Sequence, residues 1–289
     1  MSNNIFPTTD LFGNVIERDV LLRDVFIEPP FSVLDTKSGN WQKRKRLWIH
    51  KGIKSEVGRD SQVIHMDTMA KDNNSAEYTS VFDPALCEVI YKWFCPEGGS
   101  ILDPFAGGSV RGVVAHYLGY RYTGIDIRPE QIISNREQAV EILEVNNQPN
   151  WYIGDSSILL INLNKRYDLV FSCPPYGNLE VYSDIDGDIS NLEYDKFLSS
   201  YEDIIKKSCS LLKVGGFACF VVGEFRDKDG YYHGFVPDTI NAFKSSGMKF
   251  YNEAILLNAI ASASMRAMGN MKNKKLVKVH QNVLIFIKQ

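Results

Sequence analysis

The chain has 289 residues, of which 44% are hydrophobic, and its 32 Lys plus Arg against 35 Asp plus Glu give a formal net charge of −3. These values exclude a disordered chain, a collagen-like repeat and a purely basic nucleic-acid-binding tail. The length allows either two domains or one large domain with extensions, and we favour the second.

Sequence features that report on cellular location predict a soluble, cytoplasmic protein. No run approaches the roughly 18 apolar residues of a membrane-spanning helix. The N-terminal residues lack the charged-then-apolar order of a signal peptide. The five cysteines are odd in number and never spaced C-x-x-C, so we expect free thiols in a reducing compartment. The histidines lack metal-ligand spacing, and no metal site is expected.

Regular secondary structure is predicted only after an irregular N-terminal part. Residues 1–75 are polar and rich in Pro, Gly and Asn breakers. Beyond them, the pattern predicts in chain order a helix at 86–94, a strand at 100–102, a helix at 110–118, a strand at 122–127, a helix at 129–145, strands at 151–153 and 168–172, a helix at 195–212, a strand at 217–222, a helix at 237–245, and strands at 249–257 and 282–287.

This alternation of strands and helices predicts the fold class. Strands separated by helices form a parallel sheet that is covered on both faces. We therefore expect a doubly wound, Rossmann-like α/β fold, mostly parallel, whose last two strands form an antiparallel hairpin around residues 258–280. In such a fold, ligands bind beyond the carboxyl ends of the strands.

Two segments carry basic residues and no acid, at 41–54 and 258–280, while residues 180–203 are acidic. One such run is ordinarily a solvated surface, but two favour a polyanionic partner, whose counterions the cations would release. Trp41 and Trp48 either stack on bases or anchor the first segment to the core. The residues expected to contact nucleic acid are Trp41, Lys43, Arg44, Lys45, Arg46, Arg266, Lys272, Lys274, Lys275 and Lys278.

The first chemical motif is the sequence DPFAGGS at residues 103–109, between a strand and a helix. Glycines let the backbone approach a ligand and present helix N-terminal amides, although a tight strand-to-helix connection would use them equally. The motif differs from the dinucleotide and nucleoside-triphosphate signatures. Asp126 follows at the end of the next strand, about 20 residues on, where a carboxylate can accept both hydroxyls of a ribose.

Two more motifs follow the third and fourth strands of this series. Gly154-Asp155-Ser156 ends the third, and Ser172 with the tetrapeptide Cys173-Pro174-Pro175-Tyr176 ends the fourth. Consecutive prolines hold the backbone extended, so that its carbonyls can point outward as rigid acceptors. A following aromatic ring can stack on a planar group. The combination suits recognition of an amino group on an extruded base.

Together, these motifs resemble the S-adenosylmethionine-dependent DNA amino-methyltransferases, the adenine-N6 and cytosine-N4 enzymes. That family has a D-P-F-x-G-x-G-like loop followed by a [DNS]-P-P-[YFW] tetrapeptide. TSVFDP at 79–84 and HQNVLIFIK at 280–288 also match, so the resemblance covers residues 78–289. It implies S-adenosylmethionine as cofactor and site-specific methylation of a flipped adenine (N6) or cytosine (N4) in DNA, as in restriction-modification systems.

The resemblance also implies roles for individual residues. Asp103, Phe105, Gly107 and Gly108 would surround the methionine part, Asp126 would hold the ribose, Asp155 would reach the adenine, and Ser80 and Phe82 would close the pocket. The full expected cofactor set is Ser80, Phe82, Asp103, Phe105, Ala106, Gly107, Gly108, Asp126, Ile127, Asp155, Ser156 and Ser172. The expected catalytic set is Cys173, Pro174, Pro175 and Tyr176.

The expected domains follow from the motif order. Only about 65 residues separate the cofactor loop from the tetrapeptide, which leaves no room there for a target-recognition domain. We therefore expect a catalytic domain at 76–289 with a basic insertion at 258–280. Residues 1–75 would be a basic extension that takes part in DNA recognition.

The tetrapeptide departs from the family at its first residue, which is Cys173 instead of Asp, Asn or Ser. A thiol is a weak acceptor, so more of the hydrogen bonding to the target amino group would fall on the Pro174 carbonyl. Alternatively, Cys173 is a nucleophile that adds to a pyrimidine ring and activates its carbon for methylation. An RNA methyltransferase and a non-catalytic subunit of a modification complex also stay open, as does a homodimer.

Other chemically distinctive residues receive simpler interpretations. Cys87, Cys209 and Cys219 lie in apolar segments and are expected in the core. Glu224 could face the active-site cleft, but we favour a surface carboxylate, and His233 is interpreted as part of a loop near the site. Tyr231 and Tyr232 are hypothesised to contact a base.

Overall fold

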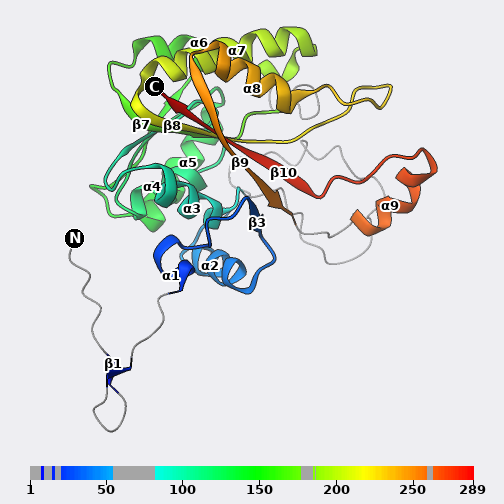
Figure 1. The fold of residues 1–289 in the computed structure, drawn as a ribbon. Helices are drawn as coiled ribbons and strands as arrows, with labels where there is room; N and C mark the ends of the chain where they lie inside the picture. Colours follow the sequence, from blue (N-terminus) through cyan, green and yellow to red (C-terminus); the bar gives the residue numbers. More distant parts are fainter. Residues whose placement is uncertain are drawn as a thin grey trace.

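An eight-stranded sheet with helices on both faces forms the centre of the molecule (Figure 1). The structure is a computed structural model that describes residues 21–54, 82–176, 185, 187–258 and 263–289, together with the backbone of 8–9 and 15–16. These last two segments are the strands β1 (Thr8–Thr9) and β2 (Val15–Ile16), which pair antiparallel with each other.

After residue 82 the elements follow the predicted order, except that the strand predicted at 217–222 begins at Leu212 and that the helices Ser156–Leu159 and Ala263–Lys272 were not predicted. The strands are β3 (Val33–Asp35), β4 (Ser100–Asp103), β5 (Arg121–Asp126), β6 (Asn150–Ile153), β7 (Tyr167–Ser172), β8 (Leu212–Val222), β9 (Met248–Leu257) and β10 (His280–Lys288). The helices are α1 (Leu22–Phe26), α2 (Gly39–His50), α3 (Pro84–Phe94), α4 (Val110–Tyr117), α5 (Pro129–Ile142), α6 (Ser156–Leu159), α7 (Tyr194–Leu211), α8 (Phe235–Ser245) and α9 (Ala263–Lys272), with short 3-10 turns η2 (Leu160–Asn162) and η4 (Ile189–Asn191).

The strand order in the sheet is β3-β9-β10-β8-β7-β4-β5-β6. Strand β10 runs antiparallel to β8 and β9, and the other neighbouring pairs are parallel. The expected fold class, a mostly parallel doubly wound sheet with an antiparallel C-terminal hairpin, is confirmed. Because β4, β5, β6 and β7 are parallel, the segments that follow them meet at one edge of the sheet.

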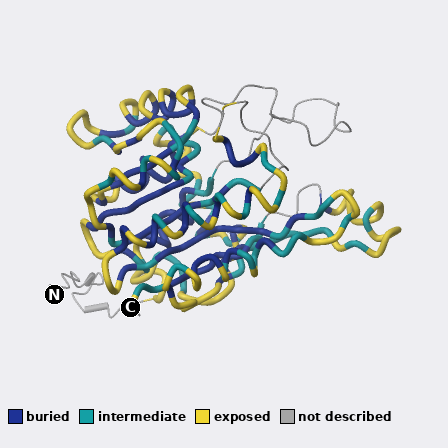
Figure 2. Tube along the Cα trace, turned by 90° about the horizontal axis from the view of Figure 1, so that it is seen from above, coloured by how far each residue is buried: buried dark blue, intermediate teal, exposed yellow. Residues whose placement is uncertain are grey.

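Side chains alternate between two hydrophobic cores, one on each face of the sheet. In β7, Leu169 and Phe171 join the core under α3, α4 and α5, whereas Val170 joins the core under α7 and α8. This is the period-2 alternation of a strand buried on both faces. Figure 2 shows the strands as the buried centre and the outer faces of the helices as exposed.

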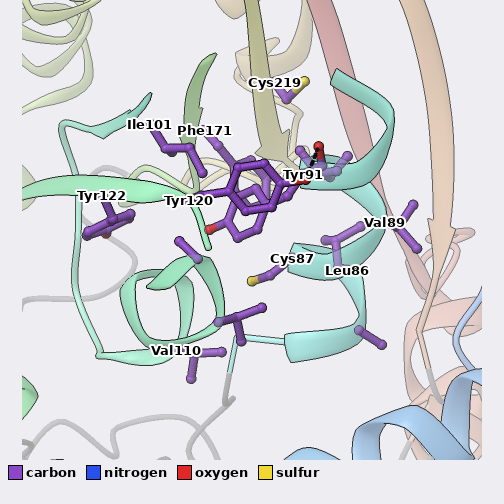
Figure 3. Close-up of a cluster of buried hydrophobic side chains, with 14 of the residues drawn as sticks. Leu86, Cys87, Val89, Tyr91, Ile101, Val110, Tyr120, Tyr122, Phe171 and Cys219 are labelled. Carbon is purple, nitrogen blue, oxygen red and sulfur yellow. Dashed lines mark hydrogen bonds between the residues drawn. The ribbon is translucent and has the colours of Figure 1, made fainter. Parts of the chain in front are cut away.

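Figure 3 shows the centre of the first core, where α3 packs on the sheet. The rings of Tyr91 and Phe171 meet edge to face, with centroids 5.6 Å apart. Cys87 and Cys219 are fully buried among these side chains, and Cys209 is buried in the second core, as expected. All five cysteines are free thiols, and burial raises the pKa of Cys209 to about 12.

Asp168, near the start of β7, forms side-chain hydrogen bonds to both neighbouring strands, β4 and β8. Its Oδ2 accepts from the Ser100 amide (2.8 Å) and hydroxyl (2.9 Å), and its Oδ1 accepts from Lys213 Nζ (2.7 Å). Burial alone would raise the pKa of this carboxyl, but the Lys213 and Ser100 hydrogen bonds lower it below its ordinary value. The contacts therefore stabilise the fold only while Asp168 is ionised.

Replacing Asp168 with asparagine is expected to lower the free energy of unfolding by about 1–2 kcal/mol at neutral pH, because hydrogen bonds to a charged group are lost. The folded-state pKa lies below the ordinary value of 3.8. The stabilisation is therefore present above pH 3.8 and is lost as the pH falls through the folded-state pKa. Urea unfolding of both proteins at several pH values checks this, and a difference that stays constant down to the acid transition would contradict it.

Part of the predicted irregular N-terminal segment is regular structure. Strand β3 adds to the sheet edge beside β9, and α2 begins where Ser38 Oγ accepts from the Trp41 amide (3.3 Å). Trp41 and Trp48 are only 1% and 3% exposed and belong to the first core. Of the two interpretations of these tryptophans, anchoring is therefore the correct one. The expected domain boundary at 75 falls in residues 55–81, outside the described ranges.

Within the described ranges, no helix combines the length and the apolar character that crossing a membrane requires.

Candidate cofactor and target site

The predicted site residues lie at the carboxyl ends of four adjacent strands. Asp103 ends β4, Asp126 ends β5, Asp155 follows β6, and the tetrapeptide follows β7. Phe82 immediately precedes α3, and Ser80 lies outside the described residues. The fold thus gathers at one edge the motifs that are far apart in the sequence.

The loop after β4 is braced at four successive backbone carbonyls. The donors are Ser156 Oγ to Pro104 (2.5 Å), Arg111 Nη2 to Phe105 (2.7 Å) and Ala106 (2.8 Å), and Asn135 Nδ2 to Gly107 (2.7 Å). The Ala106 amide in turn donates to the Ile125 carbonyl (2.9 Å). Because its polar backbone groups are held by surrounding elements, the loop has a defined shape before any ligand binds.

Asp103 is completely buried, and its carboxylate accepts from several donors. Oδ2 accepts from Arg111 Nε and Tyr122 Oη, both at 2.6 Å, and Oδ1 accepts from Ser172 Oγ (2.6 Å) and the Phe105 amide (3.2 Å). Burial works to lower the pKa of Arg111, but Asp103 raises it above its ordinary value, so Arg111 stays protonated. In this structure, Asp103 organises the loop; its contact with the methionine part stays a prediction.

Gly107 and Gly108 leave open space above the loop. Gly107 has φ +49°, in the left-handed region that favours glycine. A Cβ atom built on either glycine has no heavy atom within 4 Å. A ligand can therefore reach the backbone at this point.

Asp126 lies beside the loop with its carboxylate partly exposed. Oδ2 accepts from the Gly107 amide (2.8 Å) and Oδ1 from the Arg128 amide (2.9 Å), while Arg128 Nε lies 3.7 Å from Oδ1. Burial raises the pKa of Asp126 above its ordinary value, although Arg128 and the two amides oppose this. Each carboxylate oxygen retains a second lone pair for a ligand hydroxyl.

Asp155, Ile127 and Gly187 lie together at the next position along the edge. Asp155 Oδ1 accepts from the Ser157 amide (2.7 Å) and caps α6. A Cβ on Gly187, which has φ +92°, would lie 3.4 Å from Asp155 Oδ2 and 3.5 Å from Ile127 Cδ1. Gly187 thus lies beside two of the predicted cofactor residues, although no motif indicated it.

Phe82 packs between the loop and the first core. The Arg111 guanidinium lies 4.4 Å from the centroid of the Phe82 ring, which also meets Phe171 edge to face at 5.6 Å. The following residue, Asp83, begins α3 by accepting from the Ala85 amide (3.0 Å). Phe82 of the TSVFDP segment therefore lies beside the predicted cofactor loop.

The tetrapeptide begins just outside the core. Ser172 is completely buried, Pro174 is buried, and Cys173, Pro175 and Tyr176 are partly exposed. Tyr176 Oη accepts from Gln281 Nε2 of β10 (2.6 Å). The Tyr176 ring lies edge to face with Phe225 (6.2 Å) and Phe235 (6.0 Å), so aromatic neighbours fix its orientation.

Glu224 is a capping residue, which corrects its interpretation as a surface carboxylate. Oε2 accepts from the amides of Gly234 (3.2 Å) and Phe235 (3.1 Å), and Oε1 accepts from the Val236 amide (2.9 Å). A carboxylate at a helix N-terminus satisfies unpaired amides and the helix dipole. Glu224 therefore holds the start of α8 against the loop that supports Tyr176.

The loop from 226 to 234 borders the tetrapeptide, as expected for His233. The His233 ring stacks on Tyr194 with centroids 4.2 Å apart and lies 4.8 Å from the Phe225 ring. Tyr231 is 72% exposed, whereas Tyr232 lies under the Arg226 guanidinium at 3.9 Å. Their contact with a base stays a hypothesis.

In the first basic segment, two of the four consecutive cations form ion pairs within the protein. Arg44 pairs with Glu88 (2.5 Å) and Lys45 with Asp83 (3.3 Å), both on or next to α3. Trp41 is buried and donates to Asp83 Oδ2 (3.1 Å), so its ring does not face solvent. Lys43 and Arg46 are exposed on α2.

The second basic segment is an arm between β9 and β10 that carries α9 (Figure 1). Arg266, Lys272 and Lys274 are exposed. Lys275 and Lys278 are partly buried, and the Lys275 side chain passes directly over Gly230. The arm thus adjoins the loop that borders the tetrapeptide.

Solved structures with a similar fold include methyltransferases of several kinds. TrmN from Thermus thermophilus is 14% identical, with TM-score 0.49, covering 72% of this chain and 49% of that protein. A putative rRNA methylase from Clostridium thermocellum is 15% identical, with TM-score 0.47, covering 69% and 93%. TehB from Haemophilus influenzae is 16% identical, with TM-score 0.46, covering 73% and 64%.

The family assignment rests on matches in sequence. Residues 23–136, which include the cofactor loop and Asp126, match the DNA methylase family. A curated relative, the type II methyltransferase M2.DpnII of Streptococcus pneumoniae, is 28% identical over 123 residues, which are 36% of this chain and 43% of that protein. The alignment thus spans less than half the length of this relative. These matches support the resemblance that the motifs carry: over residues 23–136 the chain is similar to the DNA methylase family.

Proposed function

We propose that this protein transfers a methyl group from S-adenosylmethionine to the exocyclic amino nitrogen of an adenine or cytosine in DNA. The observation that carries the proposal is the direct connection between the two motifs. Ser172 Oγ, next to the tetrapeptide, donates to Asp103 of the cofactor loop at 2.6 Å. Cofactor and target sites at adjacent strand ends are the arrangement that direct transfer between two bound reactants requires.

The cofactor site has the chemistry that S-adenosylmethionine needs, and the family match supports this cofactor. The open space above Gly107 and Gly108 accommodates a ligand against the backbone. Asp126 presents a carboxylate for two ribose hydroxyls, as aspartates at this position do in related folds. Ile127 and Asp155 offer an apolar surface and an acceptor for the adenine ring and its amino group. Phe105, Ala106 and Phe82 border the methionine end.

The target site provides acceptors and an aromatic platform. S-adenosylmethionine supplies a methyl carbon on a sulfonium, and this carbon–sulfur bond breaks as the target nitrogen forms its bond to the methyl group. The Pro174 carbonyl accepts a hydrogen bond from the amino group, which directs the nitrogen lone pair towards the methyl carbon. Tyr176 stacks on the base after it leaves the helix. The amino proton then passes to solvent.

The exposed cations of α2 and of the arm are the proposed DNA contacts. Neutralising Lys43 and Arg46 together is expected to weaken DNA binding and to reduce the slope of log K against log salt by about 2, because each phosphate contact contributes about 0.9. Neutralising Arg266 and Lys272 is expected to do the same. Cofactor affinity should not change. Fluorescence anisotropy with a DNA duplex at several salt concentrations measures the slope.

The matched control for these variants replaces two exposed cations at the opposite edge of the sheet. Lys92 lies in the last turn of α3, and Lys249 lies at the start of β9. Their neutralisation changes the net charge equally but should leave the salt slope as in the wild type. If the α2 and arm variants had the same salt slope as the Lys92 and Lys249 control, DNA would not bind at α2 and the arm.

Replacing Cys173 with serine separates the amino-transfer mechanism from nucleophilic attack by the thiol. Serine occurs naturally at this position in the family and is the better hydrogen-bond acceptor. The variant is therefore expected to keep its activity within about tenfold of the wild type or to exceed it. A nucleophilic thiol would instead make the loss about 1000-fold or more. Single-turnover rates of methyl transfer distinguish the two outcomes.

Methyl transfer itself is tested with S-adenosylmethionine carrying a labelled methyl group, offered with double-stranded DNA, with RNA and with neither. The proposal predicts label in DNA only. Label in RNA alone would show that the substrate is RNA and not DNA. Binding of cofactor and DNA without any transfer would indicate a non-catalytic subunit of a modification complex, and the proposed activity would be wrong.

A further inference from the structure

Arg111 is a buried cation that lies directly behind the cofactor loop. It is the second residue of α4, and its side chain is only 5% exposed. A buried arginine is costly unless its donors are satisfied by fixed partners. The contacts of Arg111 therefore show which parts of the protein depend on it.

The guanidinium contacts three separate segments at once. Nε donates to Asp103 Oδ2 at 2.6 Å, at the end of β4. Nη2 donates to the carbonyls of Phe105 (2.7 Å) and Ala106 (2.8 Å) at the bend of the loop. The flat face lies over Phe82, which precedes α3. The planar fork of arginine suits this set of contacts, whereas the point charge of lysine cannot reproduce it.

The same contacts continue to the target side of the site. The second oxygen of Asp103 accepts from Ser172 Oγ at 2.6 Å, and Ser172 immediately precedes Cys173. A continuous series of bonds therefore leads from the loop carbonyls through Arg111 and Asp103 to the tetrapeptide.

The ion pair is not the feature that requires an arginine, because well-packed apolar side chains of similar volume often replace both partners of a buried pair without loss of stability. An apolar residue at 111 alone would leave Asp103 without its counter-ion and the carbonyls of Phe105 and Ala106 without a donor. The feature that only arginine provides is the fixed shape of the loop relative to Asp103.

We propose that Arg111 is a positioning residue that holds the cofactor loop and the Cys-Pro-Pro-Tyr tetrapeptide in one geometry. The inference rests on the proposed methyl transfer and assigns the alignment of the two reactants to this guanidinium. Loss of the fork lets the loop shift, which weakens cofactor binding. Loss of the link through Ser172 lets the tetrapeptide shift, which slows transfer.

The test compares Arg111→Lys, Ser172→Ala and the matched control Tyr122→Phe. Tyr122→Phe removes one hydrogen bond from the same Asp103 oxygen but touches neither the loop carbonyls nor the tetrapeptide. The readouts are the affinity for S-adenosylhomocysteine by calorimetry, kcat and KM for transfer to DNA, and thermal unfolding. Calorimetry reports on the loop independently of activity.

Arg111→Lys is expected to lose about tenfold or more in S-adenosylhomocysteine affinity, the effect of losing one hydrogen bond between loop and guanidinium. Ser172→Ala is expected to lower kcat by about tenfold, because the link between Asp103 and the tetrapeptide is lost. Tyr122→Phe should stay within about twofold for both quantities, although its unfolding temperature falls.

Equal cofactor affinities and kcat values for Arg111→Lys and Tyr122→Phe would overturn the inference and leave Arg111 with a purely structural role. If Arg111→Lys does not fold, Ser172→Ala decides, because it leaves the ion pair intact: an unchanged kcat would overturn the inference. A wild-type protein that binds no cofactor and transfers no methyl group would instead overturn the proposed function itself.

Discussion

Replacing Asp126 with alanine is expected to weaken the binding of S-adenosylmethionine by about 100-fold or more. A carboxylate that accepts two ribose hydroxyls contributes two hydrogen bonds to a charged group, each of about 1.5–3 kcal/mol. The change also removes the acceptor of the Gly107 amide, which shapes the cofactor loop. Isothermal titration calorimetry measures the loss. Asp168→Asn, which changes an aspartate at the opposite end of the strands, is the matched control and should bind normally.

The same carboxyl predicts a pH dependence of cofactor binding. The pKa of Asp126 is raised, chiefly by burial, so on acidification it takes up a proton at a higher pH than an ordinary aspartate. Affinity should therefore fall as the pH decreases through this raised pKa, because the protonated form accepts fewer hydrogen bonds. The contribution to stability has the opposite sign: it is present below 3.8 and is lost as the pH rises through the folded-state pKa. Wild-type affinity that does not change between neutral and mildly acidic pH would contradict the role of Asp126.

Replacing Tyr176 with alanine is expected to lower kcat/KM for DNA by about 5- to 150-fold, because stacking of a base on an aromatic ring contributes about 1–3 kcal/mol. The affinity for S-adenosylhomocysteine should stay within about twofold of the wild type. Steady-state kinetics with a duplex that contains the recognised site give the first quantity, and calorimetry gives the second.

Two matched variants separate the ring of Tyr176 from its hydroxyl. Tyr176→Phe keeps the ring between Phe225 and Phe235 but loses the hydrogen bond from Gln281. Gln281→Leu loses the same hydrogen bond from the other side. Both are expected to keep kcat/KM within a few-fold of the wild type. A loss in Tyr176→Phe as large as in Tyr176→Ala would show that the hydroxyl, and not stacking, is the essential feature.

The sequence predicts the sheet well because its strands are buried on both faces. Runs such as 168–172 and 217–222 have an apolar interior that admits few other structures, and Gly223 marks the end of the second. Strand β3 and helix α2 were not predicted. Strand β3 has only three residues and depends on pairing with β9, more than 200 residues away. Helix α2 is rich in Lys and Arg, so its few buried residues, among them Trp41 and Trp48, give a weak periodic signal.

The candidate site was predicted where the motifs themselves form it. The positions of Asp103, Asp126, Asp155 and Tyr176 at the carboxyl edge follow from the strand order and from local sequence. The supporting residues were missed, because their contacts join distant segments. Arg111 is adjacent to the motif but looks like an exposed helical residue, and Gln281 meets Tyr176 across 105 positions. Glu224 was missed as a cap for the same reason, since it lies 11 residues before Phe235, the first residue of α8.

Identification of the labelled nucleoside distinguishes transfer to an amino nitrogen from transfer to a ring carbon. DNA is incubated with the protein and with S-adenosylmethionine carrying an isotopically labelled methyl group, then digested and analysed by mass spectrometry against authentic standards. We expect the label on an exocyclic nitrogen, as N6-methyladenine or N4-methylcytosine, both in the wild type and in Cys173→Ser. Label on a pyrimidine carbon, lost in Cys173→Ser, would contradict it.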